Sequence, residues 1–460
     1  MLEDIIKERR QKIDSLISHG VNPFPSKIKR NFLIGEAIKN FNKLFSSGKK
    51  IDIAGRIISL RDQGNLIFAD IKDESGKIQT ILKKNILVNF KPLKQFLDIG
   101  DFISASGVLT KTKAGEKSIE AKTADIIVKS LRPLPSAWYG FKDVEERYRK
   151  KYLDIIFNEQ SKEKIILRSE IIRIIREELQ KEKFIEVETP IFQYLAGGAK
   201  ARPFITHHNA LNTDFYLRIA PELFLKRLLV AGFEKVFEIG RVFRNEGIDR
   251  DHNPEFTMLE LYWAYQEWEG LMEFTEKILK KAVAGVKIKN NKSKYFIKSK
   301  KWPKITYADS FKKYAKIEID KIKIKDIDEI FKKEVRPKIN EPIFITHYPK
   351  QISPLAKSYS DNPLLTERFQ LIIDGIEVVN GFSELNDPID QRERMEEQEK
   401  MHRAGDQEAS RLDEDFLEAL EYGMPPAAGL GIGIDRLIAM ATNTKNIKEV
   451  IIFTTLRSKE

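Results

Sequence analysis

The sequence predicts an α+β protein with more than one folded domain, and three observations lead to this prediction. Short strand patterns follow one another closely between residues 51 and 131, a proline-containing segment comes next, and helices then alternate with paired strands from about residue 141 onward. A chain of 460 residues is long enough for two or three domains with sizeable cores.

The composition excludes several kinds of protein. Hydrophobic residues make up 42% and charged residues 32% of the chain, which is typical of a globular protein. No apolar run reaches the roughly 20 residues of a membrane span and no signal peptide opens the sequence, so we expect no membrane association and a cytoplasmic location. The absence of cysteine excludes disulfides and thiolate metal sites. The net charge of +11 favours a polyanionic partner, although lysine is abundant throughout the chain.

Residues 1–50 are predicted to form an N-terminal helical extension. Apolar residues recur at helical spacing over residues 2–19, and Gly20 is placed to end this helix. Pro23 and Pro25 cannot continue it. A second amphipathic helix is predicted over residues 34–46.

Residues 51–131 are predicted to form a small Greek-key barrel of the OB type, because five strands within about eighty residues suit that fold. The expected strands are 51–60, 66–72, 77–82, 102–111 and 118–128. Such barrels bind single-stranded nucleic acid on the face of the second and third strands, where aromatic side chains stack on bases. Arg61, Phe68 and Gln79 come from this region. The alternative for Phe68 is a place in the barrel core.

Residues 132–140 are the predicted linker, since Pro133 and Pro135 block regular structure, and residues 141–460 form the second predicted domain. Helices are expected over residues 147–153 and 162–180, followed by strands at 184–189 and 216–220. Between these strands, the glycine-rich segment around Gly198 would let the backbone approach a ligand closely. Glu222 lies in the first turn of a helix opened by Pro221, where a carboxylate also suits the helix dipole.

Residues 236–262 read as two strands joined by a long polar loop. Because side chains alternate along a strand, Phe256, Glu260 and Tyr262 share one face. Arg244, Glu246, Arg250 and His252 lie at the strand end or in the loop. The whole set offers cations for phosphate, an aromatic ring for a base and a carboxylate for an exocyclic amine. The alternative is an amphipathic hairpin with a solvated tip.

Two stretches near the C-terminus also carry chemistry. Asp374-Gly375 predicts a two-residue hairpin turn within residues 367–384. Simple alternation places three residues, Asn380, Phe382 and Glu384, on one face of its second strand and Glu377, with Gln370 of the paired strand, on the other. Residues 391–421 are predicted to be helical with a break at 404–406. The glycines of 429–437 precede Arg436 without the spacing of a nucleotide-binding phosphate loop.

These stretches resemble the motifs of the class II aminoacyl-tRNA synthetases. Residues 243–260, with the pattern F-R-N-E…H-N-P-E-F-T-x-x-E, resemble motif 2 of the subclass that activates lysine, aspartate or asparagine. The helix, strand and Pro190 resemble motif 1, which lies in the dimer interface, and residues 429–437 resemble motif 3. Residues 220–223, 197–204 and 380–387 are similar to the lysine-specific members. The resemblance implies an OB-type anticodon-binding barrel followed by an antiparallel sheet flanked by helices.

The resemblance also implies a reaction: ATP-dependent activation of L-lysine to lysyl-adenylate, followed by transfer to the 3′-end of tRNA(Lys). It implies a homodimer and Mg²⁺ held by the residues at positions 377 and 370, where this chain has Gln370 in place of the family's acidic residue. Because both hairpin faces reach one active site in the family, a bulge or a strong bend is expected near residues 378–381. The implied site residues are Arg244 and Arg436 for catalysis; Arg244, Glu246, His252, Asn253, Phe256, Glu377 and Arg436 for ATP; Gly198, Glu222, Glu260, Tyr262, Asn380, Phe382 and Glu384 for lysine; and Arg61, Phe68 and Gln79 for the anticodon.

Two alternatives stay open from the sequence. One is an aspartyl- or asparaginyl-tRNA synthetase, which amino-acid-dependent pyrophosphate exchange distinguishes from a lysine enzyme. The other is a non-catalytic nucleic-acid-binding protein with a synthetase-like domain, although the intact Arg244, Glu246 and Arg436 argue against it. The lysine-rich segment 280–304 is interpreted as a solvated edge.

Overall fold

The structure is a computed structural model that describes residues 2–135, 143–286, 293–296 and 301–458. The chain divides into two compact units, residues 1–142 and 143–460, and this division falls close to the predicted linker. Residues 136–140 of that linker, and part of the lysine-rich segment 280–304, lie outside the described residues. Within the described ranges, no helix has the length and apolar character needed to cross a membrane.

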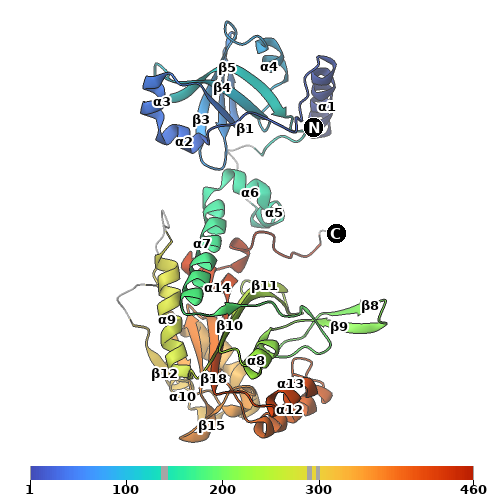
Figure 1. Cartoon of the computed structure of the whole chain (residues 1–460), viewed down its shortest axis with the longest axis vertical. Helices are drawn as coiled ribbons and strands as arrows, with labels where there is room; N and C mark the ends of the chain where they lie inside the picture. Colours follow the sequence, from blue (N-terminus) through green and yellow to red (C-terminus); the bar gives the residue numbers. More distant parts are fainter. Residues whose placement is uncertain (1, 136–142, 287–292, 297–300, 459–460) are drawn as a thin grey trace. The chain divides into compact units, whose positions relative to one another are not determined.

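The first unit contains the five-stranded closed barrel that the sequence predicts (Figure 1). Its strand order is β1-β2-β3-β5-β4, and β3 and β5 pair in parallel while the other pairs are antiparallel. Alternation fills the interior with small and branched side chains, such as Ile67, Ala69 and Ile71 of β2. The strands are β1 (Ile51–Asp62), β2 (Leu66–Lys72), β3 (Lys77–Lys83), β4 (Phe102–Lys111) and β5 (Lys117–Val128).

Helices of the N-terminal segment pack onto this barrel and share its core. Helix α1 (Leu2–Ser18) contributes the buried Leu16, and α2 (Ile34–Lys39) and α3 (Phe41–Ser47) contribute apolar residues to the same cluster. The single helix expected over residues 34–46 is therefore two helices, because the chain breaks at Asn40. Helix α4 (Phe90–Phe96) lies between β3 and β4 in the sequence. The extension is thus part of the barrel unit.

The second unit is built on an eight-stranded sheet with the order β12-β13-β16-β17-β18-β11-β10-β6. All neighbours in it are antiparallel except β12 with β13 and β10 with β6. The antiparallel core of the sheet agrees with the prediction. Its strands are β6 (Ile185–Glu186), β10 (Lys235–Phe243), β11 (Glu255–Ala264), β12 (Lys304–Thr306), β13 (Ile343–Thr346), β16 (Arg368–Ile373), β17 (Ile376–Ser383) and β18 (Ala427–Gly433).

Two smaller sheets and a set of helices complete this unit. One sheet pairs β14 (Ser358–Tyr359) with β15 (Asn362–Thr366), and the other has the order β7-β9-β8. The latter strands are β7 (Phe192–Gln193), β8 (Ile205–His208) and β9 (Thr213–Leu217). The helices are α5 (Val144–Arg149), α6 (Lys151–Phe157), α7 (Glu159–Lys181), α8 (Glu222–Val230), α9 (Trp268–Ala284), α10 (Tyr307–Ser310), α11 (Ile327–Ile330), α12 (Pro388–Arg403), α13 (Glu414–Glu421) and α14 (Ile434–Ala441), with short helical turns η1–η7 between 311 and 449.

Helices cover both faces of the large sheet, and each face has its own apolar core. On one face α7, α9 and α14 pack on strand residues such as Leu259 and Leu261. On the other face α8, α12 and α13 pack beside Val236 and Tyr262. Even-numbered residues of β11 therefore point toward the layer of α8, because alternate residues of a strand face opposite sides.

Several boundaries differ from the sequence predictions. The strand expected at 216–220 is β9, which ends at Leu217, and the strand expected at 184–189 keeps only the two residues of β6. The helical region of 391–421 breaks as predicted, with α12 ending before Gly405 at φ 109°. Short extended segments carry few neighbours that fix their ends, so their boundaries are the least predictable part of the fold.

The hairpin of β16 and β17 has the predicted turn and the predicted bulge. Asp374 and Gly375 both have positive φ, 50° and 76°, as a type I′ turn requires. In the register, Leu371 faces Val379 while the next residue, Ile372, faces Glu377. Val378 is therefore an extra residue, and it shifts Glu377 to the side of the sheet that carries Gln370 and Asn380.

Candidate active site

Strands β10, β11, β17 and β18 place polar side chains on the sheet face covered by α8. Strand β11 has no bulge in its pairing with β10 or β18, so Phe256, Glu260 and Tyr262 lie on one face of the strand, as predicted. The glycines of β18 make room for these side chains: a Cβ at Gly429 would lie 2.4 Å from both the Glu384 carboxylate and the Tyr262 ring. The small residues of this strand thus let two site side chains meet above it.

Arg244 lies at the centre of one half of this face. Its guanidinium is 5.1 Å from the centre of the Phe256 ring, and its Nε donates a long hydrogen bond of 3.4 Å to the Ile219 carbonyl oxygen. Burial lowers the pKa of Arg244, and the charges of Glu246, Arg436, Glu377 and Glu260 all act on it. The structure therefore brings the predicted ATP-binding cations and carboxylates to one place.

Arg436 and Glu377 meet across the boundary between β17 and α14. Arg436 lies in the first turn of α14, and its Nη1 donates a hydrogen bond of 3.1 Å to the backbone oxygen of Glu377. Strand β18 is followed directly by α14, so residues 429–437, which resemble motif 3, form a strand-to-helix turn. Backbone N–H groups of such a helix start favour an anion, and Arg436 adds a cation beside them.

Gln370 and Glu377 form a hydrogen-bonded pair. The Tyr348 hydroxyl donates to Gln370 Oε1 at 2.7 Å, and Gln370 Nε2 donates to Glu377 Oε2 at 3.0 Å. In this arrangement the amide turns a donor toward the carboxylate, so the two residues alone do not fit a metal ion held by the protein. The described part of the chain also contains no group of three or more His, Cys, Asp or Glu placed to hold a metal.

Three of the predicted lysine-binding residues, Glu222, Glu260 and Glu384, form a buried acidic cluster, called the acidic pocket here. Glu222, Glu260 and Glu384 are all at most 6% exposed. The Tyr262 hydroxyl donates to Glu260 Oε2 at 3.0 Å. Burial raises the pKa of Glu260 well above its usual value and that of Glu384 to about 8. The charged form of a buried carboxylate is costly unless a cation lies nearby, so these carboxylates favour a cationic ligand.

Gly198 and Phe382 shape the walls of this pocket. Gly198 has a φ of 86°, and a Cβ there would lie 2.8 Å from the Glu222 Cβ, so only glycine fits against the start of α8. Phe382 is 9% exposed and supplies an apolar wall. Asn380 Oδ1 accepts a hydrogen bond of 2.9 Å from Arg368 Nε, which fixes this amide at the pocket's edge toward Gln370.

His252 and Asn253 take part in contacts within the protein. His252 Nδ1 lies 2.9 Å from Asp249 Oδ2 in the loop between β10 and β11. Asn253 is buried, its Nδ2 donates to the Glu255 carbonyl oxygen at 2.7 Å, and its Oδ1 accepts from Thr454 at 3.1 Å. The Asn253 amide therefore holds the loop, while a contact of either residue with ATP stays a prediction.

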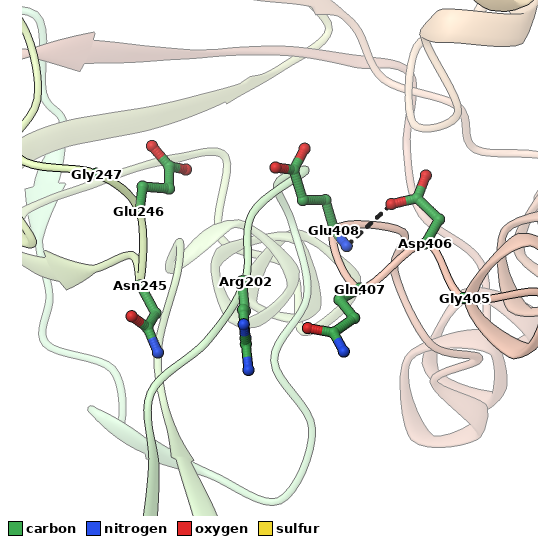
Figure 2. Close-up of a pocket in the computed structure, with 8 residues that line it drawn as sticks. All are labelled: Arg202, Asn245, Glu246, Gly247, Gly405, Asp406, Gln407 and Glu408. Atoms are coloured by element: carbon green, nitrogen blue, oxygen red, sulfur yellow. Dashed lines mark hydrogen bonds between the residues drawn. The ribbon is translucent and has the colours of Figure 1, made fainter.

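An open polar pocket of about 520 Å³ adjoins this loop (Figure 2). The Glu246 carboxylate borders it from the loop, and the segment after α12 borders it from the opposite side. The Asn245 backbone N–H donates to the Arg202 carbonyl oxygen at 2.8 Å and ties two of the walls together. Apart from Glu246, the lining was not predicted as functional: Arg202, Asn245, Gly247 and residues 405–408.

On the barrel, the three predicted anticodon-binding residues lie on one outer face. Arg61 pairs directly with Phe68 across β1 and β2, and Asp70, two residues beyond Phe68, pairs with Gln79 of β3. The Arg61 guanidinium is 5.8 Å from the centre of the half-buried Phe68 ring. Phe68 therefore lies opposite the interior side chains of β2 and is not a core residue. Gln79 is buried, and its Oε1 accepts from Ser118 at 3.0 Å.

The sequence reasoning missed two residues that hold the site together. Asp435 accepts a hydrogen bond of 2.9 Å from the Thr257 backbone N–H and forms an ion pair with Arg168, so it joins α14, β11 and α7. Lys226 is fully buried among the pocket carboxylates. Its spacing of four residues from Glu222 on α8 was the available signal, since residues four apart are neighbours on a helix.

Comparisons with known proteins identify the family of each part of the chain. Residues 143–457 match the family model of the class II tRNA synthetases for D, K and N, and residues 51–127 match the model of the OB-fold nucleic acid binding domain.

Curated relatives match along the whole chain. Lysine–tRNA ligases from Pelotomaculum thermopropionicum, Moorella thermoacetica and Clostridium tetani are each 44% identical, with 98–100% of this chain and 96–98% of each relative covered. The chain therefore belongs to the class II tRNA synthetases and, within them, to the lysine–tRNA ligase family.

Proposed function

We propose that the second unit activates L-lysine with ATP in the pocket between β11, β17 and α8, and then transfers the lysyl group to tRNA(Lys). The observation that carries this proposal is the pocket of three buried carboxylates beside Arg244. Such a pocket suits a ligand with two ammonium groups and one carboxylate. Among the standard amino acids, lysine has that charge pattern with a flexible apolar chain between the two ammonium groups.

Positioning and electrostatics supply the chemistry of the first step, and no protein nucleophile is needed. Arg244 is placed to bridge the lysine carboxylate and the ATP α-phosphate, which approach each other in the transition state. The Phe256 ring stacks on adenine, Glu246 accepts from its exocyclic amine, and Arg436 holds the outer phosphates. Lysyl-adenylate and pyrophosphate are the products.

The lysine side chain extends toward the inner end of the pocket. Glu222 binds the α-ammonium, while Glu384 and the Tyr262 hydroxyl accept from the side-chain ammonium. Phe382 covers the methylene groups between them. This assignment is supported by the burial of all three carboxylates, because an uncharged side chain would leave one of them without a cation.

Magnesium enters, in this proposal, as part of the ATP complex. Glu377 is the one carboxylate of the Gln370–Glu377 pair, so it is the residue that reaches such an ion when ATP is bound. Magnesium offsets phosphate charge there. Gln370 contributes a neutral amide in place of the family's acidic residue.

The barrel face of Arg61, Phe68 and Gln79 is proposed to bind the anticodon. Phe68 offers a half-buried ring for stacking, and Arg61 offers donors beside it. The net charge of +11 supports a polyanionic partner. A cytoplasmic location follows from this function, since tRNA charging serves protein synthesis.

A homodimer is proposed from the edge of the large sheet. Strand β6 ends the strand order, and exposed apolar side chains gather in it and in the segment that follows. These side chains are Ile185, Ile191, Phe192 and Tyr194. Sedimentation should give twice the 53.3 kDa of one chain. Phe192→Asp should halve that mass, whereas Tyr422→Asp, at another exposed aromatic residue directly after α13, should not. A monomeric unmodified protein would contradict the proposal.

The function is tested by ATP–pyrophosphate exchange with each amino acid in turn. Lysine should support exchange, and aspartate and asparagine should not, because neither carries a second ammonium group. Charging of tRNA(Lys) with lysine then tests the second step. Exchange with aspartate or asparagine in place of lysine would overturn the assignment.

A further inference from the structure

The buried ammonium of Lys226 lies between two carboxylates of the pocket. Its Nζ donates to Glu222 Oε1 at 2.6 Å and lies 2.6 Å from Glu384 Oε2. Lys226 and Glu384 are both 0% exposed. The same Nζ is 5.3 Å from the centre of the Phe382 ring. Three proposed lysine-binding residues thus contact one lysine of the protein itself.

We propose that Lys226 is a positioning residue that fixes the Glu222 and Glu384 carboxylates and sets the pocket's charge so that it matches a ligand with two ammonium groups. This inference rests on the proposed function of the same pocket. Lys226 would thereby determine the preference for lysine over amino acids with uncharged side chains of the same length.

A count of charges supports the proposal. The pocket holds three carboxylates, on Glu222, Glu260 and Glu384, among the described residues. The Lys226 ammonium balances one of them, and the two ammonium groups of a bound lysine balance the other two. The carboxylate of the bound lysine faces Arg244. Removal of Lys226 would leave three buried carboxylates with two cations, and an unbalanced buried charge is strongly unfavourable.

The environment of Glu384 gives a second argument. The Lys226 Nζ lies 2.6 Å from Oε2, and no other residue in the described ranges donates a hydrogen bond to either carboxylate oxygen. Burial raises the pKa of Glu384 and the Glu222 charge adds to this, whereas Lys226 lowers it. Tyr262 is a further titratable group beside it, and Tyr262 in turn pairs with Glu260. Glu384 Oε1 is therefore left for a ligand cation, and Lys226, which pairs with Oε2, favours the charged form of this carboxylate.

The same geometry allows a rival in which Lys226 imitates the substrate. In that case its ammonium occupies the place of the ligand's side-chain ammonium and must leave when lysine binds. Lys226 has no exposed surface and contacts Phe416 of α13 as well as Phe382, so it is held from the side of the helices. This packing favours the first role, in which the Lys226 ammonium stays in place as a counter-ion when lysine binds.

Lys226→Met removes the ammonium and keeps an unbranched apolar side chain. We expect the kcat/KM for lysine in pyrophosphate exchange to fall at least tenfold, while that for norleucine, which lacks the side-chain ammonium, stays within about threefold. The KM for ATP should not change. The pH at which lysine binding reaches half its maximum should move upward, because Glu384 loses the cation that lowers its pKa.

A matched control is available on α9. Lys280 is also buried, pairs with the glutamate four residues earlier, Glu276, at 2.5 Å, and lies 4.9 Å from the centre of the Trp302 ring. Lys280→Met should change neither the lysine nor the norleucine parameters. If Lys226→Met does not fold, Lys226→Gln keeps the length and a hydrogen-bond donor and gives the same comparison.

Two measurements on the unmodified protein need no variant. Its lysine-dependent exchange tests the proposed function separately, and calorimetry in buffers of different ionisation enthalpy should show proton release when lysine binds at pH 7. An absence of proton release would overturn the inference. Equal losses for lysine and norleucine would also overturn it, as would an unchanged lysine KM. Tighter lysine binding by the Lys226→Met variant would overturn it in favour of the substrate-imitating role.

Discussion

At the scale of single residues, we propose that Arg244 serves two anions, the lysine carboxylate and the ATP α-phosphate. It lies over Phe256, partly buried, among the charges of Glu246, Arg436 and Glu377. Arg244→Ala should abolish pyrophosphate exchange and leave the circular dichroism spectrum unchanged. Arg241→Ala, at an exposed position of the same strand, is the control and should be active. Exchange by the Arg244 variant within tenfold of the unmodified protein would refute its role.

Glu384 carries the second prediction at this scale. Glu384→Gln keeps the shape of the side chain and removes the charge that we propose faces the lysine ammonium. The lost pairing of a buried charge is worth roughly 3–5 kcal/mol, so the kcat/KM for lysine should fall by roughly two to three decades at about 1.4 kcal/mol per decade. The KM for ATP should change little. A parallel shift of the lysine and ATP parameters, with a lower melting temperature, would instead indicate a structural role.

Residue positions were predictable from the sequence where a regular strand carried them. Glu260 and Tyr262 share a face because β11 has no bulge, and simple alternation was enough. Lys226 was not predictable, because a Glu–Lys pair four residues apart usually lies on a solvated helix surface. Its burial depends on Glu384 and Phe416, which come from distant parts of the chain.

At the scale of elements, the hairpin of β16 and β17 decides which carboxylates reach the site. Alternation alone separated Glu377 from Asn380, and only the family resemblance required a bulge between them. The extra residue, Val378, provides it. The Asp374-Gly375 turn was predictable because few residue pairs tolerate two positive φ angles. The bulge was not predictable from local sequence, since valine is typical of regular strands and does not mark a bulge.

The Gln370–Glu377 pair of this hairpin gives a prediction about magnesium. Gln370→Glu replaces the amide that donates to Glu377 by a second carboxylate. Two facing carboxylates repel each other unless a cation lies between them, so the variant should bind divalent cations more tightly. The magnesium midpoint of exchange should fall, and Mn²⁺ should bind to the ATP-free variant by electron paramagnetic resonance. An unchanged midpoint together with no Mn²⁺ binding would show that this pair does not lie near the metal.

At the scale of the whole molecule, each of the two units has its own core. We propose that the barrel recognises the anticodon and that the second unit recognises lysine and ATP. The barrel was predictable in full because five short strands with clear turns fix its order of elements. The second unit was harder, since its sheet joins strands from opposite ends of the sequence, such as β10 and β18 on either side of β11. Pairing between strands far apart in the sequence leaves little local signal. The antiparallel sheet was therefore predicted from the resemblance to family motifs and not from hydrophobic periodicity.

A substitution of Phe68 tests whether the barrel binds tRNA without taking part in lysine activation by the second unit. Its ring lies on the outer face of the barrel, opposite the interior residues Ile67 and Ala69, so its removal should not open the core. Phe68→Ala should cost roughly 1–3 kcal/mol of tRNA binding through one lost base stack. The KM for tRNA should therefore rise about tenfold or more, while pyrophosphate exchange, which needs no tRNA, stays unchanged.

Phe102→Ala is the matched control for this prediction. Phe102 is another half-buried phenylalanine of the barrel, with the Arg56 guanidinium 4.3 Å from its ring centre, but it lies on β4, outside the face of β1, β2 and β3 that carries Arg61 and Phe68. If both variants weaken charging equally, the loss reflects barrel stability. If Phe68→Ala lowers exchange as much as charging, the barrel face does not act through tRNA. A selective loss of charging by Phe68→Ala alone would place the anticodon on this face and make the two recognition events separable by mutation.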